Sequence, residues 1–368
     1  MIALLMTSLL LSILCFLCLW RSWSTRSATS ESPRLKTSPL RKDNCWLEYR
    51  TINGRATELL WVFPAHVKGP TTLIVMVPGF PGVSQIYAGF MDDVTSHTGS
   101  AAVCISWMGH HVSPQGHGIE TENANLQEHV AHQADAMQWL LDTARWDRVV
   151  LCAQSLGAWL AVSALSRLDQ QQSAGMRTTL IQEVQLFCPV MEHMADVERA
   201  RQLGWALRLV WRLRAAYILG AVVRCFGVKR VGEGIYYIQS LRGKTDHSDV
   251  AHAGWLWESL ARHMPLEVFP KAIDAAVEGL SLIGAFTEDM KETLEARQVD
   301  IHYAKDDGWT PVHMQRKWRT DFPSAAVWTH NIRHALVTNP ARAKEVAKVA
   351  AQRMIETSSR GLCVRMNN

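Results

Sequence analysis

The chain has 368 residues, of which 48% are hydrophobic and 20% are charged, with a formal net charge of +4. The apolar content is sufficient for a large core, and about 320 residues between the two ends fit one large α/β domain with an insertion. So small a net charge argues against nucleic acid as a partner. The eight cysteines lack metal-ligand spacing, since the pair Cys15 and Cys18 lies in an apolar run, so we expect reduced thiols and neither a metal nor a cofactor.

The N-terminal segment, residues 1–20, is almost entirely apolar and is long enough to span a bilayer. Basic residues follow this segment, which is the opposite of the charge order in a cleaved signal peptide and predicts that the rest of the chain faces the cytosol. A monotopic anchor in a membrane or a lipid monolayer is equally compatible. Residues 21–43 are rich in Ser, Thr, Pro and basic residues, so we expect a disordered linker.

Residues 44–358 alternate between strand and helix patterns. Strands are predicted as a hairpin around Asn53-Gly54 and then at 71–77, 101–106, 149–152, 184–189, 299–304 and 325–330. Helices are predicted at 124–144 and 156–168, from about Pro311, and at 340–357. Such alternation predicts a mostly parallel sheet with helices on both faces. The alternation of strand and helix patterns stops between about 190 and 298, which indicates a helical cap insertion. Residues 359–368 are expected to be a tail. An opening antiparallel hairpin and a late insertion match the α/β-hydrolase fold.

A strand, a sharp turn and a helix are predicted from the stretch RVVLCAQSLGAWLAVSAL, residues 148–165. Ser155 lies at the turn, with the small residues Ala153 and Gly157 two positions before and after it. A nucleophile elbow requires small residues there, because a larger side chain would meet the neighbouring backbone. In most nucleophile elbows the residue two positions before the serine is glycine. The alternative interpretation is that Ser155 is only the N-cap of the following helix.

A nucleophilic serine needs a histidine base and a carboxylate, which in this fold follow it in the order acid, then histidine. Asp306 and Asp307 come directly after the strand predicted at 299–304. We choose Asp307 because it precedes Gly-Trp and stands four residues before Pro311. Capping of the next helix is the alternative role for either aspartate.

The last predicted strand is followed by two candidate bases, His330 and His334. We expect His330 to lie near the strand end and His334 to lie in the loop that reaches Ser155. The predicted catalytic set is therefore Ser155, Asp307 and His334, with a partly buried loop histidine as the alternative for the last.

An oxyanion hole requires two backbone N–H groups aimed at the developing charge. One is expected from Leu156, directly after the nucleophile, and the other from the loop Pro78–Gly82. Prolines have no N–H group, so Phe80 or Gly79 is the expected second donor. A plain Gly/Pro turn is the alternative.

Seven motifs, read in order from about residue 72 to 358, resemble the lipid droplet-associated hydrolase family. They are VPGFPG, SWMGHH, LQEHVAHQ, AQSLGAW, LFCPVMEHMA, YAKDDGWTPV and RHALV. The resemblance places the family's nucleophile on Ser155, its acid on Asp307 and its base on His334. The chain departs from the family pattern where Ala153-Gln154 replaces Gly-His and where Phe80 replaces Asn.

This resemblance implies a serine esterase-like protein of lipid droplets and the endoplasmic reticulum, linked to neutral lipid or sterol ester metabolism and to lipid storage. The predicted function is hydrolysis of a lipid ester through an acyl-enzyme on Ser155. Two alternatives stay open: a droplet or membrane scaffold that has lost efficient catalysis, and an acyltransferase that uses the same three residues.

The predicted insertion contains a basic and apolar segment, residues 201–223. On a helical wheel Arg201, Arg208 and Arg212 share one face. The other face carries Leu203, Leu207, Val210, Leu213 and Tyr217. This arrangement favours contact with a membrane or droplet surface. The alternatives are a lid helix whose arginines are solvated and, more weakly, a calmodulin-like partner.

Overall fold

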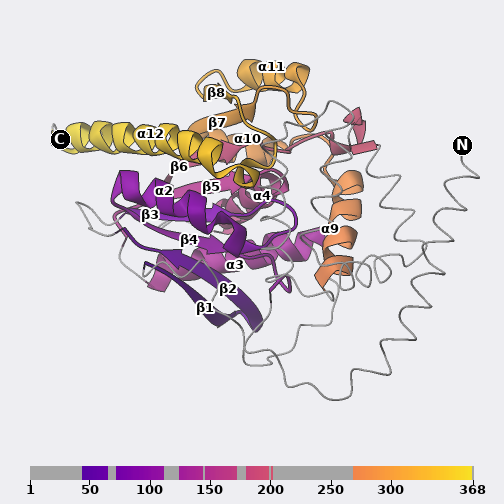
Figure 1. The fold of residues 1–368 in the computed structure, drawn as a ribbon, viewed down its shortest axis with the longest axis horizontal. Coiled ribbons are helices and arrows are strands. Elements are labelled where there is room, and N and C mark those ends of the chain that lie inside the picture. Colours follow the sequence, from indigo (N-terminus) through magenta and orange to yellow (C-terminus); the bar gives the residue numbers. More distant parts are fainter. Residues whose placement is uncertain are drawn as a thin grey trace, which may run out of the picture. The chain divides into compact units, whose positions relative to one another are not determined.

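The computed structural model describes residues 44–64, 72–111, 124–143, 146–171, 180–198, 200–201 and 268–366 (Figure 1). The predicted anchor 1–20, the linker 21–43 and nearly all of the basic segment 201–223 lie outside these residues. Within the described residues, no helix combines the length and apolarity that a membrane crossing requires.

Eight strands form one sheet in the order β1-β2-β4-β3-β5-β6-β7-β8. They are β1 (Cys45–Ile52), β2 (Arg55–Val62), β3 (Thr72–Val77), β4 (Ala101–Ile105), β5 (Arg148–Gln154), β6 (Ile181–Phe187), β7 (Gln298–Ala304) and β8 (Ala326–His330). The β1–β2 and β2–β4 pairs are antiparallel, and all other neighbouring pairs are parallel. The mostly parallel sheet predicted from the sequence is confirmed.

The hairpin between β1 and β2 turns at Asn53 and Gly54, whose φ angles are +48° and +78°. Positive φ at both central residues is typical of the tight turn that matches the twist of paired strands. Asn tolerates this region better than most residues, and glycine meets no steric barrier there. The Asn-Gly pair therefore explains where the first hairpin forms.

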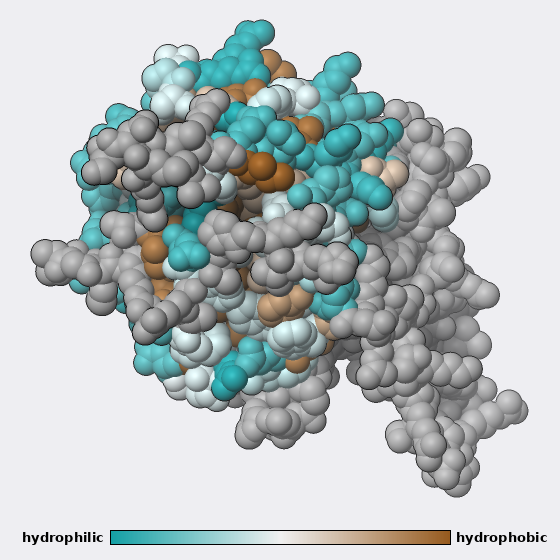
Figure 2. All heavy atoms as spheres, turned by 90° about the vertical axis from the view of Figure 1, so that its left-hand side faces the viewer, coloured by the Kyte–Doolittle hydropathy of each residue, from teal (hydrophilic) through white to brown (hydrophobic). Residues whose placement is uncertain are grey.

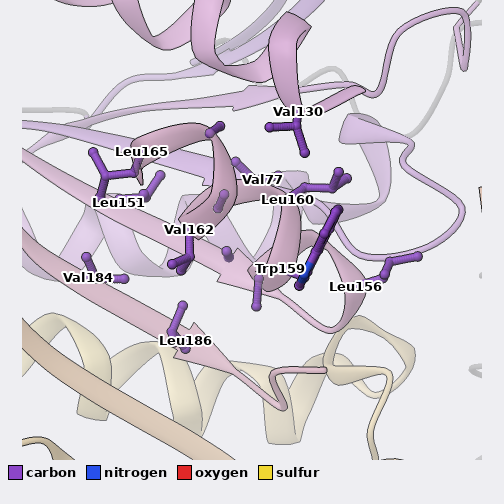
Figure 3. Packing of buried hydrophobic residues seen from close by; sticks show 14 of the residues in the cluster. Val77, Val130, Leu151, Leu156, Trp159, Leu160, Val162, Leu165, Val184 and Leu186 are labelled. Atoms are coloured by element: carbon purple, nitrogen blue, oxygen red, sulfur yellow. The ribbon is translucent and has the colours of Figure 1, made fainter. Parts of the chain in front are cut away.

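Helices cover both faces of the sheet (Figure 1). On one face, α2 (Ala88–Thr98) packs against α12 (Pro340–Met366), and on the other α4 (Leu156–Gln171) packs against α3 (Leu126–Thr143) and α10 (Glu288–Glu295). Every residue of β5 is buried, as expected for a central strand covered on both sides. Figure 3 shows how α4 packs on the sheet: its apolar side chains lie over β3, β5 and β6, and Val130 of α3 lies beside them.

The ends of the insertion meet beside the sheet. The His193 N–H donates to the Gly284 carbonyl (2.7 Å), and the Met194 N–H donates to the Ile283 carbonyl (3.1 Å). Between these points, α9 (Val268–Leu282) is tied to α3, since Glu278 accepts a hydrogen bond from the Leu126 N–H (2.9 Å). The chain therefore leaves and rejoins the hydrolase scaffold at one place, after β6.

Two boundaries differ from the sequence predictions. Helix α10 packs on α4 and β7, so it belongs to the layer that covers the sheet, and the insertion predicted to end at about 298 ends before Glu288. Helix α12 continues to Met366, beyond the predicted end at 357 and into the predicted tail. Helices α2, α9 and α10 were not predicted individually.

Large hydrophobic side chains are seldom exposed on the described residues. Figure 2 shows one face on which hydrophilic residues predominate and hydrophobic ones form small groups. The exposed large hydrophobic residues are Trp46, Leu47, Phe80, Leu282, Val312 and Ile355. Isolated residues of this kind are normal on a globular surface, but Phe80 is notable because it lies in the predicted oxyanion loop.

Candidate active site

Ser155 occupies the sharp turn between β5 and α4 in a strained backbone conformation. Its φ is +52°, in the left-handed region that non-glycine residues rarely adopt. Its N–H donates to the Phe187 carbonyl (3.0 Å), and its own carbonyl accepts from the N–H groups of Ala158 (3.0 Å) and Val190 (3.1 Å). Hydrogen bonds from β6, from α4 and from the chain after β6 therefore hold the turn in place.

The small residues around Ser155 are required by close packing. A Cβ atom at Gly157 would lie 2.3 Å from the Pro78 carbonyl oxygen, far inside van der Waals contact. Ala153 is fully buried, and its backbone pairs with Val77 on one side and Leu186 on the other. The elbow thus packs directly against the loop that follows β3.

The structure brings Ser155, His334 and Asp307 into one chain of hydrogen bonds. Ser155 Oγ lies 2.7 Å from His334 Nε2. His334 Nδ1 lies 2.8 Å from Asp307 Oδ2 and 3.0 Å from Oδ1. Because a carboxylate only accepts, Nδ1 carries the proton and Nε2 is left to accept from the serine hydroxyl. This is the arrangement that a nucleophilic serine requires.

The two rejected candidates lie apart from this chain. His330, on β8, lies with its Nε2 2.9 Å from His302 Nδ1, and Asp306 is exposed. The alternative helix-capping role does not fit Asp307 either, because Pro311 is the N-cap of α11 (Val312–Asp321).

Asp307 is ionised in a buried site. Its side chain has no exposed surface, and its Oδ1 also accepts from the Trp309 N–H (2.9 Å). Burial alone would raise the pKa of Asp307, but His334 and the Trp309 N–H outweigh burial, so the pKa is lowered below its usual value. The indole ring of Trp309 lies beside the imidazole, with 5.8 Å between the ring centroids. The carboxylate is therefore available to orient His334 and to stabilise its protonated form.

Sequence reasoning missed Cys188, which lies beside the triad. Its thiol is fully buried, and burial together with the nearby Asp307 carboxylate raises the pKa of the thiol well above its usual value, so the thiol stays protonated. Cys188 also has a positive φ of +45°. Its place directly after β6, at the sheet edge that carries Ser155, was the available signal.

The atoms of Cys188, Asp307 and His334 that could ligate a metal lie within 4.8 Å of one another. The hydrogen bond between Asp307 and His334 accounts for the proximity of two of these groups. The thiol proton and the Nδ1 proton would both have to leave before an ion could bind there. The set therefore fits acid–base chemistry better than metal binding.

Two backbone N–H groups of the loop after β3 are already engaged in hydrogen bonds. The Gly79 N–H donates to the Tyr87 hydroxyl (2.9 Å), and the Gly82 N–H donates to the Gly79 carbonyl (2.8 Å). Pro78 and Pro81 have no N–H group. Of the two donors predicted in this loop, Gly79 is therefore already engaged, and Leu156, the other predicted donor, is the first residue of α4, directly after Ser155.

A mostly parallel sheet with a serine elbow after its central strand, an acid after β7 and a histidine after β8 defines an α/β-hydrolase. Solved structures share this fold. A carboxylesterase of the Thaumarchaeon Nitrososphaera gargenis is 14% identical, with a TM-score of 0.59, covering 85% of this chain and 100% of the esterase. The enol-lactonase of Burkholderia xenovorans LB400 is also 14% identical, with a TM-score of 0.53, covering 84% of this chain and 100% of the lactonase.

The family model described as lipid-droplet associated hydrolase matches residues 70–337, and the chain belongs to this family. A human protein named lipid droplet-associated hydrolase is 24% identical over 316 residues, covering 79% of this chain and 90% of the human protein. The predicted α/β-hydrolase fold, the family resemblance and the expectation of a hydrolytic enzyme are confirmed.

Proposed function

We propose that this protein hydrolyses lipid esters through an acyl-enzyme on Ser155, with His334 as the base and Asp307 as the orienting carboxylate. The observation that carries the proposal is the unbroken chain from Ser155 Oγ through His334 to Asp307, with contacts of 2.7 and 2.8 Å. A scaffold protein has no need to keep a serine at positive φ beside an ionised buried carboxylate.

The proposed reaction proceeds in two steps. Ser155 Oγ attacks the ester carbonyl while His334 Nε2 takes its proton, and the N–H groups of Leu156 and Phe80 stabilise the oxyanion. The tetrahedral intermediate collapses when His334 returns the proton to the departing alcohol, which leaves an acyl-enzyme. Water then attacks with the same base and releases the acid. Asp307 stays ionised throughout and stabilises the imidazolium in both steps.

The substrate class and location rest on other observations. The human relative is named for lipid droplets, and Phe80, in the loop beside Ser155, is 44% exposed, so it presents an aromatic ring to an apolar acyl chain. The apolar residues 1–20 and the basic segment 201–223 are the proposed contacts with a droplet or endoplasmic reticulum membrane, with the catalytic domain in the cytosol.

Labelling with a fluorophosphonate probe tests the proposed chemistry. The wild type should be labelled and should release 4-nitrophenol from 4-nitrophenyl butyrate, and Ser155→Ala should abolish both. Ser163→Ala, in the same helix α4, is the matched control and should behave as the wild type. A folded wild type that resists the probe favours the scaffold alternative. A wild type that is labelled by the probe but forms product only when an acceptor alcohol is present favours the acyltransferase.

Cells fed with fatty acid test the proposed location. A fluorescent fusion of the full chain should mark droplets or membranes, and deletion of residues 1–20 should weaken that association. A second variant combines this deletion with substitution of Ser for Leu203, Leu207, Val210 and Leu213. It should be released to the cytosol. A deletion that alone makes the protein fully soluble would leave the segment 201–223 as a lid only. If the variant that combines the deletion with the four Ser substitutions is folded and still stays bound, the proposed contacts are refuted.

A further inference from the structure

A chain of hydrogen bonds links the oxyanion loop to the loop that carries the base. The Gly79 N–H donates to the Tyr87 hydroxyl (2.9 Å), and the Tyr87 hydroxyl donates to Gln154 Oε1 (2.6 Å). The Gln154 side-chain amide in turn donates through Nε2 to the His334 carbonyl oxygen (2.8 Å). The link therefore passes behind Ser155 through the residue that directly precedes it.

The direction of every bond in this link is fixed. A backbone N–H only donates and a backbone carbonyl only accepts, so the hydroxyl of Tyr87 must accept from Gly79 and donate onward. The Gln154 amide then has one orientation that satisfies both neighbours. Burial raises the pKa of Tyr87, so its hydroxyl keeps the proton that this order requires.

The link is shielded from water. Tyr87 is 1% exposed and Gln154 is 4% exposed. A buried donor or acceptor that loses its partner here loses a hydrogen bond that solvent does not replace. The link is therefore stiff, and a shift of one loop is resisted by the other.

The link determines the geometry of the oxyanion loop. By engaging the Gly79 N–H, it leaves the next amide, that of Phe80, for the oxyanion. The loop is also pressed against the elbow, because a Cβ at Gly79 would lie 2.2 Å from Gln154 Oε1 and 3.0 Å from Ser155 Cβ. Only glycine fits between the link and the nucleophile.

The link also holds the base. Asp307 and Ser155 fix the imidazole of His334, whereas Gln154 and the Leu336 N–H (3.0 Å) fix its carbonyl oxygen. The ring and the backbone of His334 are thus anchored separately. Loss of the Gln154 contact would free the backbone while the ring contacts remain.

We propose that Tyr87 and Gln154 are positioning residues that couple the oxyanion loop to the loop of His334, so that the donor and the base keep one spacing across Ser155. This inference rests on the proposed function, since the spacing matters for acyl transfer. Neither side chain touches the reacting atoms. Their effect is expected on the turnover step and not on ground-state binding of the ester.

The test compares the full-length wild type with Tyr87→Phe, Gln154→Met and the double variant. Phe removes one hydroxyl, and Met keeps the length of Gln without its donor and acceptor. Gln154→His is the conservative replacement, because a neutral imidazole has one donor and one acceptor nitrogen. Tyr49→Phe is the control for loss of a tyrosine hydroxyl elsewhere, since Tyr49 binds Glu58 (3.0 Å) and takes no part in the link.

The kinetic readout is kcat and KM for 4-nitrophenyl butyrate, per active site titrated with the fluorophosphonate. Each single variant in the link should lose about tenfold in kcat with KM within about twofold. The double variant should be no worse than the poorer single variant, because both substitutions break the same link. Gln154→His should recover most of the loss, and Tyr49→Phe should match the wild type. Losses that multiply to about a hundredfold, or that vanish once kcat is divided by the titrated sites, would overturn the coupling.

Hydrogen exchange provides a readout that does not depend on activity. In Gln154→Met, the amides of Gly79, Phe80 and Gly82 and those of residues 331–336 should both exchange faster than in the wild type. Unchanged exchange in either loop overturns the inference. A wild type that neither reacts with the probe nor cleaves the ester defeats the proposed function. An active wild type whose link variants keep the wild-type kcat defeats only the coupling.

Discussion

Replacing Asp307 with asparagine removes a buried charge next to the proposed base and changes little else. The carboxylate lies 2.8 Å from His334 Nδ1, and the imidazole becomes positively charged in the transition state. Two unit charges about 4 Å apart, at an effective dielectric constant of about 20, attract by about 4 kcal/mol. Loss of that attraction corresponds to about a 10³-fold fall in kcat. An asparagine that turns its amide toward Nδ1 also favours the wrong tautomer, which lowers kcat further.

The assay is kcat for a soluble short-chain ester, with the thermal midpoint as a check on folding. Asp306→Asn is the matched control, because Asp306 is exposed and adjacent in sequence. We expect Asp307→Asn to stay folded with KM nearly unchanged, and Asp306→Asn to behave as the wild type. An Asp307→Asn enzyme within tenfold of the wild type, or a larger loss in Asp306→Asn, would refute the assignment of the carboxylate.

Three further predictions concern the loop, the elbow and the response to pH. Phe80→Ala should keep kcat for a short ester within about threefold, because the proposed hole uses the backbone N–H; a loss near a hundredfold would contradict this. Gly157→Ala should destabilise the fold by about 1–3 kcal/mol, because its Cβ would lie 2.3 Å from the Pro78 carbonyl oxygen. Gly89→Ala is the control, since its Cβ would have nothing within 4 Å. Equal denaturation midpoints for the two variants would refute the prediction. Burial lowers the pKa of His132 from 6.5 to about 3. Below pH 6.5 the unfolded chain therefore binds a proton that the folded chain does not, so the free energy of unfolding decreases as the pH is lowered. His132→Gln should therefore reduce the loss of unfolding free energy between pH 6.5 and 5 by about 2 kcal/mol, and identical urea titrations of both proteins would contradict it.

Local patterns were sufficient for the sheet and for the catalytic candidates. Strands such as β5 are short apolar runs, and the Asn-Gly pair at 53–54 specifies a hairpin through backbone sterics alone. Ser155, Asp307 and His334 could be chosen because parallel strands bring their carboxyl ends to one edge of a sheet. The end of the insertion was harder to predict, because only the packing of α10 on α4 and β7 shows that this helix belongs to the layer that covers the sheet.

The sequence by itself determined the order of the elements and the chemical types at three strand ends, because chain order and side-chain chemistry are local properties. It did not show that the Gly79 N–H is already engaged by Tyr87, and it gave no role to Tyr87, Gln154 or Cys188. Those outcomes depend on contacts between segments far apart in the chain, such as Gly79 with Tyr87 and Gln154 with His334. Only the folded structure decided them, because a backbone N–H has the same chemistry at every position, and the partner that packing brings to it determines what it can do.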